Sequence, residues 1–349
     1  MKRILYKAKS WFTVATFFSI CLLLLNTGLL AQNDSTAVAE KPAASAKIKP
    51  VKNTFQSIWI TDNQTVFVPV KGTLEMDISH RFGTWNKGYQ DMWGLFAPSN
   101  IRIGINYSPI NKLNVGVGFT KTTAAVVPQA SISSVSGPLW DGSLKYSIIT
   151  QTKGKYPVSV SYYVNAAYNT KKDLNKEIYR HTSDRLSFFH QILIARKITD
   201  KLSVQVAPSL SHHNTVNGYY TKENDSTLKI NRSMQFEHFA VALSARYKIT
   251  NVTSLMINYD QPITKHATKN PNPSLSFGVE FTTSSHSFQL CFTNFYFLNP
   301  AINNMYNSNN PFTYTDKSTD DPATPINEST KVNGGKFLIG FNITHLWNY

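Results

Sequence analysis

The chain has 349 residues and a formal net charge of +15, with 16% charged and 13% aromatic residues. Soluble domains carry about 25% charged residues. The low charge and many aromatics therefore argue against an ordinary soluble domain and favour strands that face lipid. The basic residues do not cluster into a stripe with interleaved aromatics, so we expect no nucleic-acid partner.

Residues 1–31 have the features of a secretory signal peptide. An apolar run covers 11–30, Ala31 ends an acceptable cleavage site, and the preceding basic region contains Lys2, Arg3, Lys7 and Lys9. An uncleaved signal anchor is the alternative, but Asn26 and Gly28 interrupt the run. Cleavage would leave Cys291 as the only cysteine, so we expect no internal disulfide.

The next two segments differ in composition. Residues 32–53 are rich in Ala, Lys, Ser and Pro and show no apolar period, which predicts a flexible leader. Residues 54–72 are more apolar and predict a small β-turn-β unit. This unit either plugs the lumen of the domain that follows or packs below it, and the sequence leaves both arrangements open.

From residue 73 to the end, apolar and polar side chains alternate with a period of two. In the stretch 184–211, for example, Leu186, Phe188 and Ile192 share one face of a strand, whereas Ser187 and Gln191 share the other. A turn at 199–201 leads into a second strand with the same alternation. The pattern recurs in about twelve segments, each long enough to cross a bilayer when tilted.

The gaps between these segments alternate between short and long, and the longest is 298–334. This alternation is typical of outer-membrane barrels, which have short periplasmic turns and long outer loops. We therefore predict an all-β, transmembrane, antiparallel up-and-down barrel over 73–349, exported to the cell outer membrane. Its C-terminal strand, which keeps the alternation to Tyr349, is expected to be read by the barrel-assembly machinery, and its wall to contact outer-membrane lipids and lipopolysaccharide.

Several blocks of this alternating region resemble a known family. They are HRFG at 80–83, NIRIG at 100–104, WDGSLKY at 140–146, HQILIARK at 190–197, HSFQL at 286–290 with TN at 293–294, and GFNI at 340–343. In order and spacing they are similar to an uncharacterised group of Gram-negative β-barrel proteins, domain of unknown function 5777. The resemblance covers about 54–349. It implies a signal peptide and an outer-membrane barrel, and it implies no activity.

The polar parity of the strands predicts which side chains line the lumen. These are Glu75, Asp77, Arg81, Arg102, Lys145, Arg185, Gln191, Arg246, Asp260, Glu280 and Lys336. They would form either a charged constriction that selects solutes or a network of ion pairs that fills a narrow barrel and holds its strands in register. The parity also turns Phe189, Leu193 and Leu338 inward, which favours a partly blocked lumen.

The apolar parity carries two histidines and several aromatics. His80 and His190 are expected on the lipid face near the outer rim, and the predicted aromatic girdles contain Tyr107, Trp140, Tyr259 and Trp347. A lipid-facing hydrolase with a histidine-activated serine is the catalytic alternative, but Ser79 and Ser187 fall on the opposite parity. We therefore expect no enzyme. No metal or cofactor motif is visible in the sequence, and we expect none.

Three functions remain open from the sequence. The leading hypothesis is a narrow channel or transporter for small solutes, biased toward anions by the lumen arginines and lysines. The second is a closed structural or docking barrel whose long outer loops, especially 298–334, bind a partner or surface polymer. The third, less favoured, is an envelope-lipid enzyme.

Overall fold

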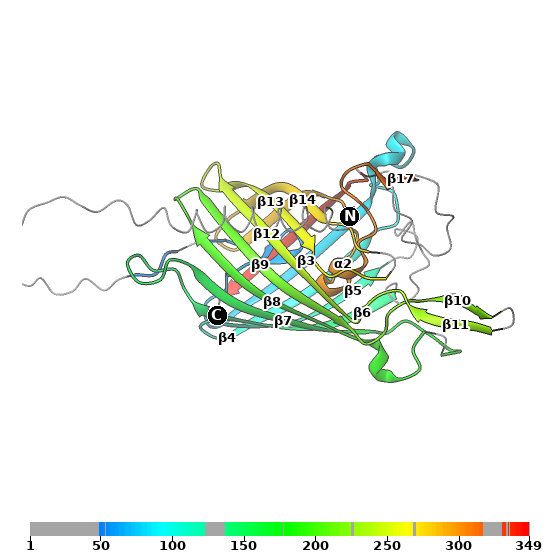
Figure 1. The fold of residues 1–349 in the computed structure, drawn as a ribbon. Coiled ribbons are helices and arrows are strands. Elements are labelled where there is room, and N and C mark those ends of the chain that lie inside the picture. The colour runs from blue at the N-terminus through cyan, green and yellow to red at the C-terminus, as the bar shows by residue number, and fades with distance from the viewer. Residues whose placement is uncertain are drawn as a thin grey trace, which may run out of the picture.

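The computed structural model describes residues 49–52, 54–122, 137–176, 178–224, 227–267, 270–316, 330–332, 334 and 336–348. In this part of the chain, twelve antiparallel strands close into one barrel (Figure 1). They are β3 (Thr73–Thr84), β4 (Asn100–Ile110), β5 (Leu113–Thr122), β6 (Gly137–Ile149), β7 (Ser159–Asn169), β8 (Leu186–Lys197), β9 (Leu202–His213), β12 (Glu237–Lys248), β13 (Thr253–Pro262), β14 (Ser274–Thr282), β15 (His286–Thr293) and β18 (Leu338–Asn348). Pairing of β18 with β3 closes the cylinder. The predicted fold class and strand number are confirmed.

The two-residue rhythm of each strand sorts its side chains between lipid and lumen. On β4, Ile101, Ile103 and Ile105 are exposed on the outer wall, while Asn100 and Arg102 are buried inside. Closure of the sheet pairs the backbone groups of every barrel strand, which is the condition for a strand to lie in hydrocarbon. The apolar outer wall and the absence of a free sheet edge together explain how this sequence folds in a bilayer.

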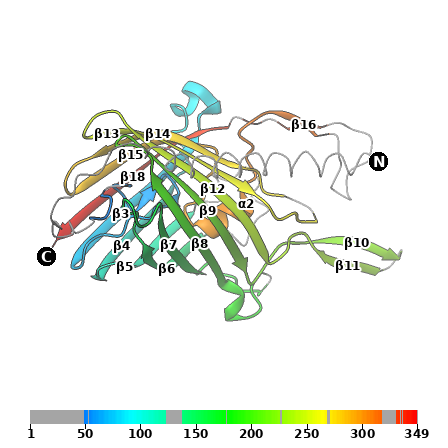
Figure 2. The ribbon, with the colours of Figure 1, turned by 60° about the vertical axis from the view of Figure 1, so that its left-hand side comes forward.

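The connections differ between the two ends of the barrel. Tight turns join β4 to β5, β8 to β9, β12 to β13 and β14 to β15 at what we name the short-turn end. The opposite, long-loop end carries the extended connections, and in both views the hairpin of β10 (Gly218–Asn224) and β11 (Thr227–Arg232) projects beyond it (Figures 1 and 2). The other loop elements are η1 (Trp85–Asp91), η3 (Thr182–Arg185), β16 (Tyr314–Asp316) and β17 (Thr330–Val332).

The segment predicted as a β-turn-β unit lies inside the barrel. Residues 54–69, named the N-terminal plug, contain the short strands β1 (Trp59–Ile60) and β2 (Asn63–Gln64) and are buried over most of their length. The chain reaches the plug from the short-turn end, where the Val51 amide donates to the Gln151 carbonyl at 2.8 Å. The predicted signal peptide and residues 32–48 of the leader lie outside the described residues.

A second segment enters the lumen from the long-loop end. Residues 294–309, named the loop insert, are buried over most of their length and carry the helix α2 (Pro300–Tyr306). Asn299 caps this helix through its side-chain oxygen, and proline occupies the first helical position, as is typical of helix starts. Ile302, Met305 and Tyr306 pack against the inner wall in one apolar cluster. None of the helices in the described part of the chain is both long and apolar enough to cross a membrane.

The outer wall generates a testable prediction. Ile105 is exposed at the middle of β4, and Ile110 is exposed at its end. We expect Ile105→Arg to lower the free energy of unfolding by about 2–4 kcal/mol, because it places a cation at the bilayer midplane, and Ile110→Arg to lower it by about 0–1 kcal/mol. Denaturant unfolding from lipid vesicles measures both. Equal losses would mean that this wall does not face hydrocarbon.

Candidate functional site in the barrel lumen

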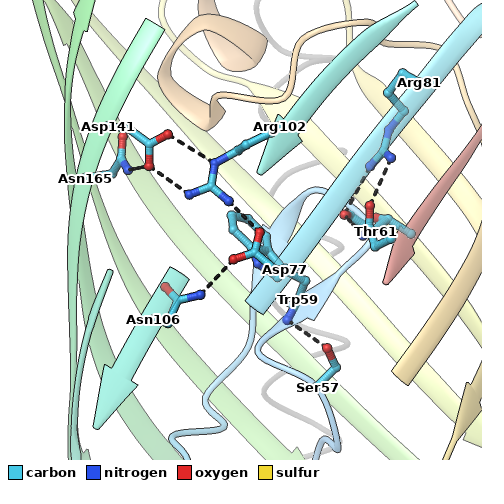
Figure 3. A network of polar contacts seen from close by, with 10 residues as sticks. Ser57, Trp59, Thr61, Asp77, Arg81, Arg102, Asn106, Asp141 and Asn165 are labelled. Carbon is cyan, nitrogen blue, oxygen red and sulfur yellow. Dashed lines mark hydrogen bonds and ion pairs between the residues drawn. The ribbon is translucent and has the colours of Figure 1, made fainter. Parts of the chain in front are cut away.

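The centre of the lumen holds an ion-pair network around Arg102 of β4 (Figure 3). Its guanidinium lies 2.6 Å from Asp77 Oδ1 of β3 and donates to both oxygens of Asp141 on β6, at 3.1 and 2.9 Å. Asn106 and Asn165 donate to the same two carboxylates. The pairing with Asp141 is bidentate, the geometry that makes arginine–carboxylate contacts strong and directional.

Inward-facing glycines make room for this network. A Cβ at Gly104 would collide with the Asp77 carboxylate, and a Cβ at Gly118 would collide with the Arg102 guanidinium. Both glycines lie on the lumen-facing side of their strands, where the other residues are mostly polar. The alternation of glycine with larger outward residues on β4 and β5 is thus a packing requirement of the ion pairs.

Basic side chains of the wall hold the backbone of the N-terminal plug. Arg81 donates to the Thr61 carbonyl at 3.2 Å, and Lys145 donates to the Thr65 carbonyl at 3.2 Å and to the Gln64 side chain at 2.9 Å. The Arg102 guanidinium also lies 5.5 Å from the ring of Trp59, within the range of a cation–π contact. Three of the lumen cations are therefore engaged by the plug.

Glutamines on two separate strands, β15 and β9, replace the strand partners that the plug lacks. Gln289 accepts from the Thr61 amide at 3.1 Å and donates to the Trp59 carbonyl at 2.7 Å. Gln205 does the same for the Val66 amide and the Gln64 carbonyl, at 3.1 and 2.7 Å. A side-chain amide offers one acceptor and two donors, so it can satisfy a buried backbone N–H and C=O together.

A second ion pair lies closer to the short-turn end. Arg246 of β12 contacts Glu280 of β14 at 2.5 Å and also donates to the Gln56 side chain of the plug. Glu280 in turn accepts from Gln289 at 3.0 Å. The contacts of this pair again link the wall to the plug.

The plug meets the loop insert at a pair of buried acids. Asp62 of the plug accepts from Asn303 of the insert at 2.8 Å, and Asn258 of the wall donates to Asp62 at 3.2 Å. Asp260, also buried, accepts from Asn63 at 2.8 Å. Burial raises the pKa of Asp62 to about 6, against an ordinary value of 3.8.

Most of the predicted lumen residues point inward, and two lie outside the barrel strands. Nine lie buried inside the barrel: Glu75, Asp77, Arg81, Arg102, Lys145, Gln191, Arg246, Asp260 and Glu280. Arg185 instead ends the 3-10 helix η3, where its guanidinium lies 4.4 Å from the Tyr179 ring. Lys336 precedes β18, and its carbonyl accepts from Asn309 at 2.6 Å. Both residues lie outside the barrel strands, so strand parity does not apply to them, and their lumen position stays a prediction.

The balance of buried charge bears on the expected preference for anions. Among the described residues, six buried carboxyl side chains (Asp62, Glu75, Asp77, Asp141, Asp260 and Glu280) face four buried basic ones (Arg81, Arg102, Lys145 and Arg246). All four cations contact acids or plug oxygens. The four lumen cations are therefore engaged in this structure, and the preference for anions stays a prediction.

The outward residues lie on the lipid-facing wall. His80 stacks on Phe341 at 5.0 Å between ring centroids, and the Tyr162 hydroxyl lies 2.6 Å from His190 Nδ1. The predicted girdle residues divide between the two ends by their strand positions: Tyr107 and Trp347 lie toward the short-turn end, Trp140 and Tyr259 toward the long-loop end. This division is the arrangement expected of two interfacial belts.

The Arg102 network generates a stability prediction. Arg102→Met leaves Asp77 and Asp141 buried without their cation, so we expect a loss of about 3–5 kcal/mol in the free energy of unfolding. The triple variant D77N/R102M/D141N should recover much of that loss. Lys197→Met is the control, because its 4.0 Å contact with the fully exposed Asp200 is a surface pair, for which we expect less than about 1 kcal/mol. Similar losses for R102M and K197M would contradict the structural role of the network.

Asp62 generates a prediction for pH. Since its folded-state pKa of about 6 exceeds the ordinary 3.8, the folded barrel binds this proton more tightly than the unfolded chain does. The contribution of Asp62 to stability is therefore fullest below about pH 4 and is lost as the pH rises through about 6. Melting temperatures of Asp62→Asn should fall less over this interval than those of the wild type. Asp200→Asn, an exposed control, should follow the wild type, and parallel curves for all three proteins would refute the assignment.

The chain was compared with known proteins. Residues 55–347 match the family described as membrane bound beta barrel domain (DUF5777), and no curated protein matches. Similar solved structures include an outer membrane channel from Pseudomonas putida F1 (TM-score 0.43, 12% identity, covering 80% of this chain and 97% of that one). The NanC porin is another (TM-score 0.40, 7% identity, 79% and 99% covered), and these likenesses concern the fold alone. The family match spans most of the sequence and confirms the resemblance in its blocks: the chain belongs to this family of membrane-bound β-barrel domains.

Proposed function

We propose that the protein is a gated channel of the outer membrane for small polar solutes, and that this structure is its closed state. The observation that carries the proposal is the filling of one barrel by two separate segments from opposite ends. The N-terminal plug enters from the short-turn end, and the loop insert enters from the long-loop end. Each closes its own half of the lumen.

The size of the barrel supports a conduit over a purely structural role. Barrels of eight strands are filled by their own side chains, and the interior widens as strands are added. Twelve strands enclose more space than their inward side chains occupy, so this chain needs additional segments to fill the lumen.

The way in which the two segments are held also supports gating. The plug is anchored by hydrogen bonds from Arg81, Lys145, Gln205 and Gln289, and its Phe55, Ile60 and Val66 also join an apolar cluster with wall residues such as Phe189 and Leu193. Water can replace the polar part of these contacts when the plug moves, because most of the inward side chains are polar. The excess of buried carboxyl groups favours neutral or cationic solutes as cargo.

The docking alternative loses part of its basis. Residues 298–309 of the long connection, expected to bind a partner outside, lie buried inside the barrel. The element that projects from the long-loop end is instead the β10–β11 hairpin (Figure 2). An envelope-lipid enzyme also finds little support, since His80 stacks on Phe341 and His190 contacts a tyrosine hydroxyl; the absence of catalysis stays a prediction.

Planar-bilayer recording tests the proposed channel. The wild type should give rare or no unitary currents. A variant that lacks residues 54–69, with α2 replaced by a Gly-Ser linker, should conduct steadily because both closing segments are gone. The matched control removes the β10–β11 hairpin, which lies outside the lumen, and should stay as silent as the wild type.

Folding must be established for each variant before the currents are compared. Heat-modifiable migration on denaturing gels reports a closed barrel. A folded double variant without currents above those of the hairpin deletion would refute the channel and favour a structural barrel.

A further inference from the structure

A cavity opens at the short-turn end of the barrel, on the side of the plug opposite to the loop insert. Its volume is about 450 Å³. The plug contributes Gln56, Ser57, Ile58 and Phe67, and the tight turns at its mouth contribute Asn251 and Ser284 among others. The cavity is therefore reached from the short-turn end while the lumen beyond it remains closed.

Glu75 of β3 forms part of the wall of this cavity. Its side chain is 1% exposed, and neither carboxyl oxygen has a hydrogen-bond partner in the part of the chain that the structure describes. The other five buried carboxyl side chains of the described residues all accept hydrogen bonds from neighbours. A buried carboxylate without donors is strongly unfavourable, so the structure leaves this group in need of a partner.

The neighbours of Glu75 do not supply that partner. Lys145 is the cation whose charge acts on Glu75, but its ammonium group donates hydrogen bonds to Gln64 and Thr65 of the plug. The side chain of Asn106, directly opposite Glu75 on β4, donates to Asp77 instead. No side chain of the described residues supplies a donor to this carboxyl group, and the cavity offers a route for one from the short-turn end.

The lining of the cavity defines the chemistry of that donor. It contains no arginine or lysine and one histidine, His286, and elsewhere in its lining it offers the hydroxyl groups of Ser57, Thr282, Ser287 and Thr344. Carboxylate and hydroxyl oxygens suit the three donors of a primary ammonium, while Phe67 and Ile58 offer apolar surface to an aliphatic chain. A Ca²⁺ ion fits less well, because it takes six to eight oxygen ligands and usually several carboxylates.

We propose that this cavity binds a small organic cation with a primary ammonium group, held by Glu75 and entering from the short-turn end. The proposal goes beyond the channel function and does not require it, since the cavity opens at the short-turn end in the closed barrel. It assigns to a ligand the one buried carboxyl group that has no hydrogen-bond partner among the described residues.

Calorimetric titration of the full folded protein in detergent with 1,4-diaminobutane at neutral pH tests the site. We expect saturable binding to the wild type and an affinity weaker by about tenfold or more in Glu75→Gln, which keeps the shape and removes the charge. Asp200→Asn loses the same charge at an exposed position of the same end and should bind like the wild type. 1,4-Butanediol, of equal length and uncharged, should not bind.

A second variant keeps the test decisive if Glu75→Gln does not fold. Thr344→Leu adds bulk to the cavity wall while leaving Glu75 in place, and it should also weaken binding of the diamine. Heat-modifiable migration identifies the folded variants. Absence of saturable binding to the wild type, or equal affinity in the folded cavity variants and the wild type, would overturn the proposal.

Discussion

The interior of this barrel is governed by the need of buried polar groups for partners. In hydrocarbon the sheet must close, and closure directs the polar side chains of all twelve strands into the same lumen. Each inward carboxylate, guanidinium or amide then requires a donor or acceptor within that space. The Arg102 network shows the solution in its simplest form, since one guanidinium on β4 serves two carboxylates, Asp77 on the neighbouring β3 and Asp141 on β6, two strands away on the other side.

The N-terminal plug satisfies the same requirement with a different chemistry. Its two short strands pair only with each other and do not join the barrel sheet. Their outer backbone groups would be unpaired without the side chains of Gln205, Gln289 and the lumen cations. The polar side chains of the wall thus satisfy the unpaired backbone groups of the plug. An entirely apolar wall would leave those backbone groups without partners.

The sequence predicts the barrel well because its decisive signal is local. The alternation within each strand has a period of two residues, and the gaps between strands differ in length. Both signals are visible in the sequence without knowledge of any contact. The alternation no longer predicts side-chain orientation beyond the strand ends. Arg185 lies in a 3-10 helix, and Lys336 lies in an irregular segment. Asp141 is absent from the predicted lumen residues, although it has the same parity as Lys145 on β6. Extending the alternation of that strand toward its start predicts its lumen position.

Contacts between distant segments are what the sequence does not reveal. That Asp62 would lie beside Asp260, or that the loop insert would turn inward, depends on how a closed cylinder is filled, and no periodic signal records it. A weak local hint exists in the insert, where Asn299 followed by Pro300 starts a helix and asparagines are frequent along 299–309. Amide side chains are suited to a polar interior, but equally to an exposed loop.

The two closing segments are coupled to each other less than each is coupled to the wall. The described contacts between them are the hydrogen bond from Asn303 to Asp62 and an apolar cluster that includes Ile60 and Ala301. The plug, in contrast, bonds to strands around the circumference through Arg81, Lys145, Gln205 and Gln289. The insert likewise bonds to the wall, through Asn299 to Asn165 and Asn304 to Ser209. Each segment is therefore positioned mainly by the part of the wall that surrounds it.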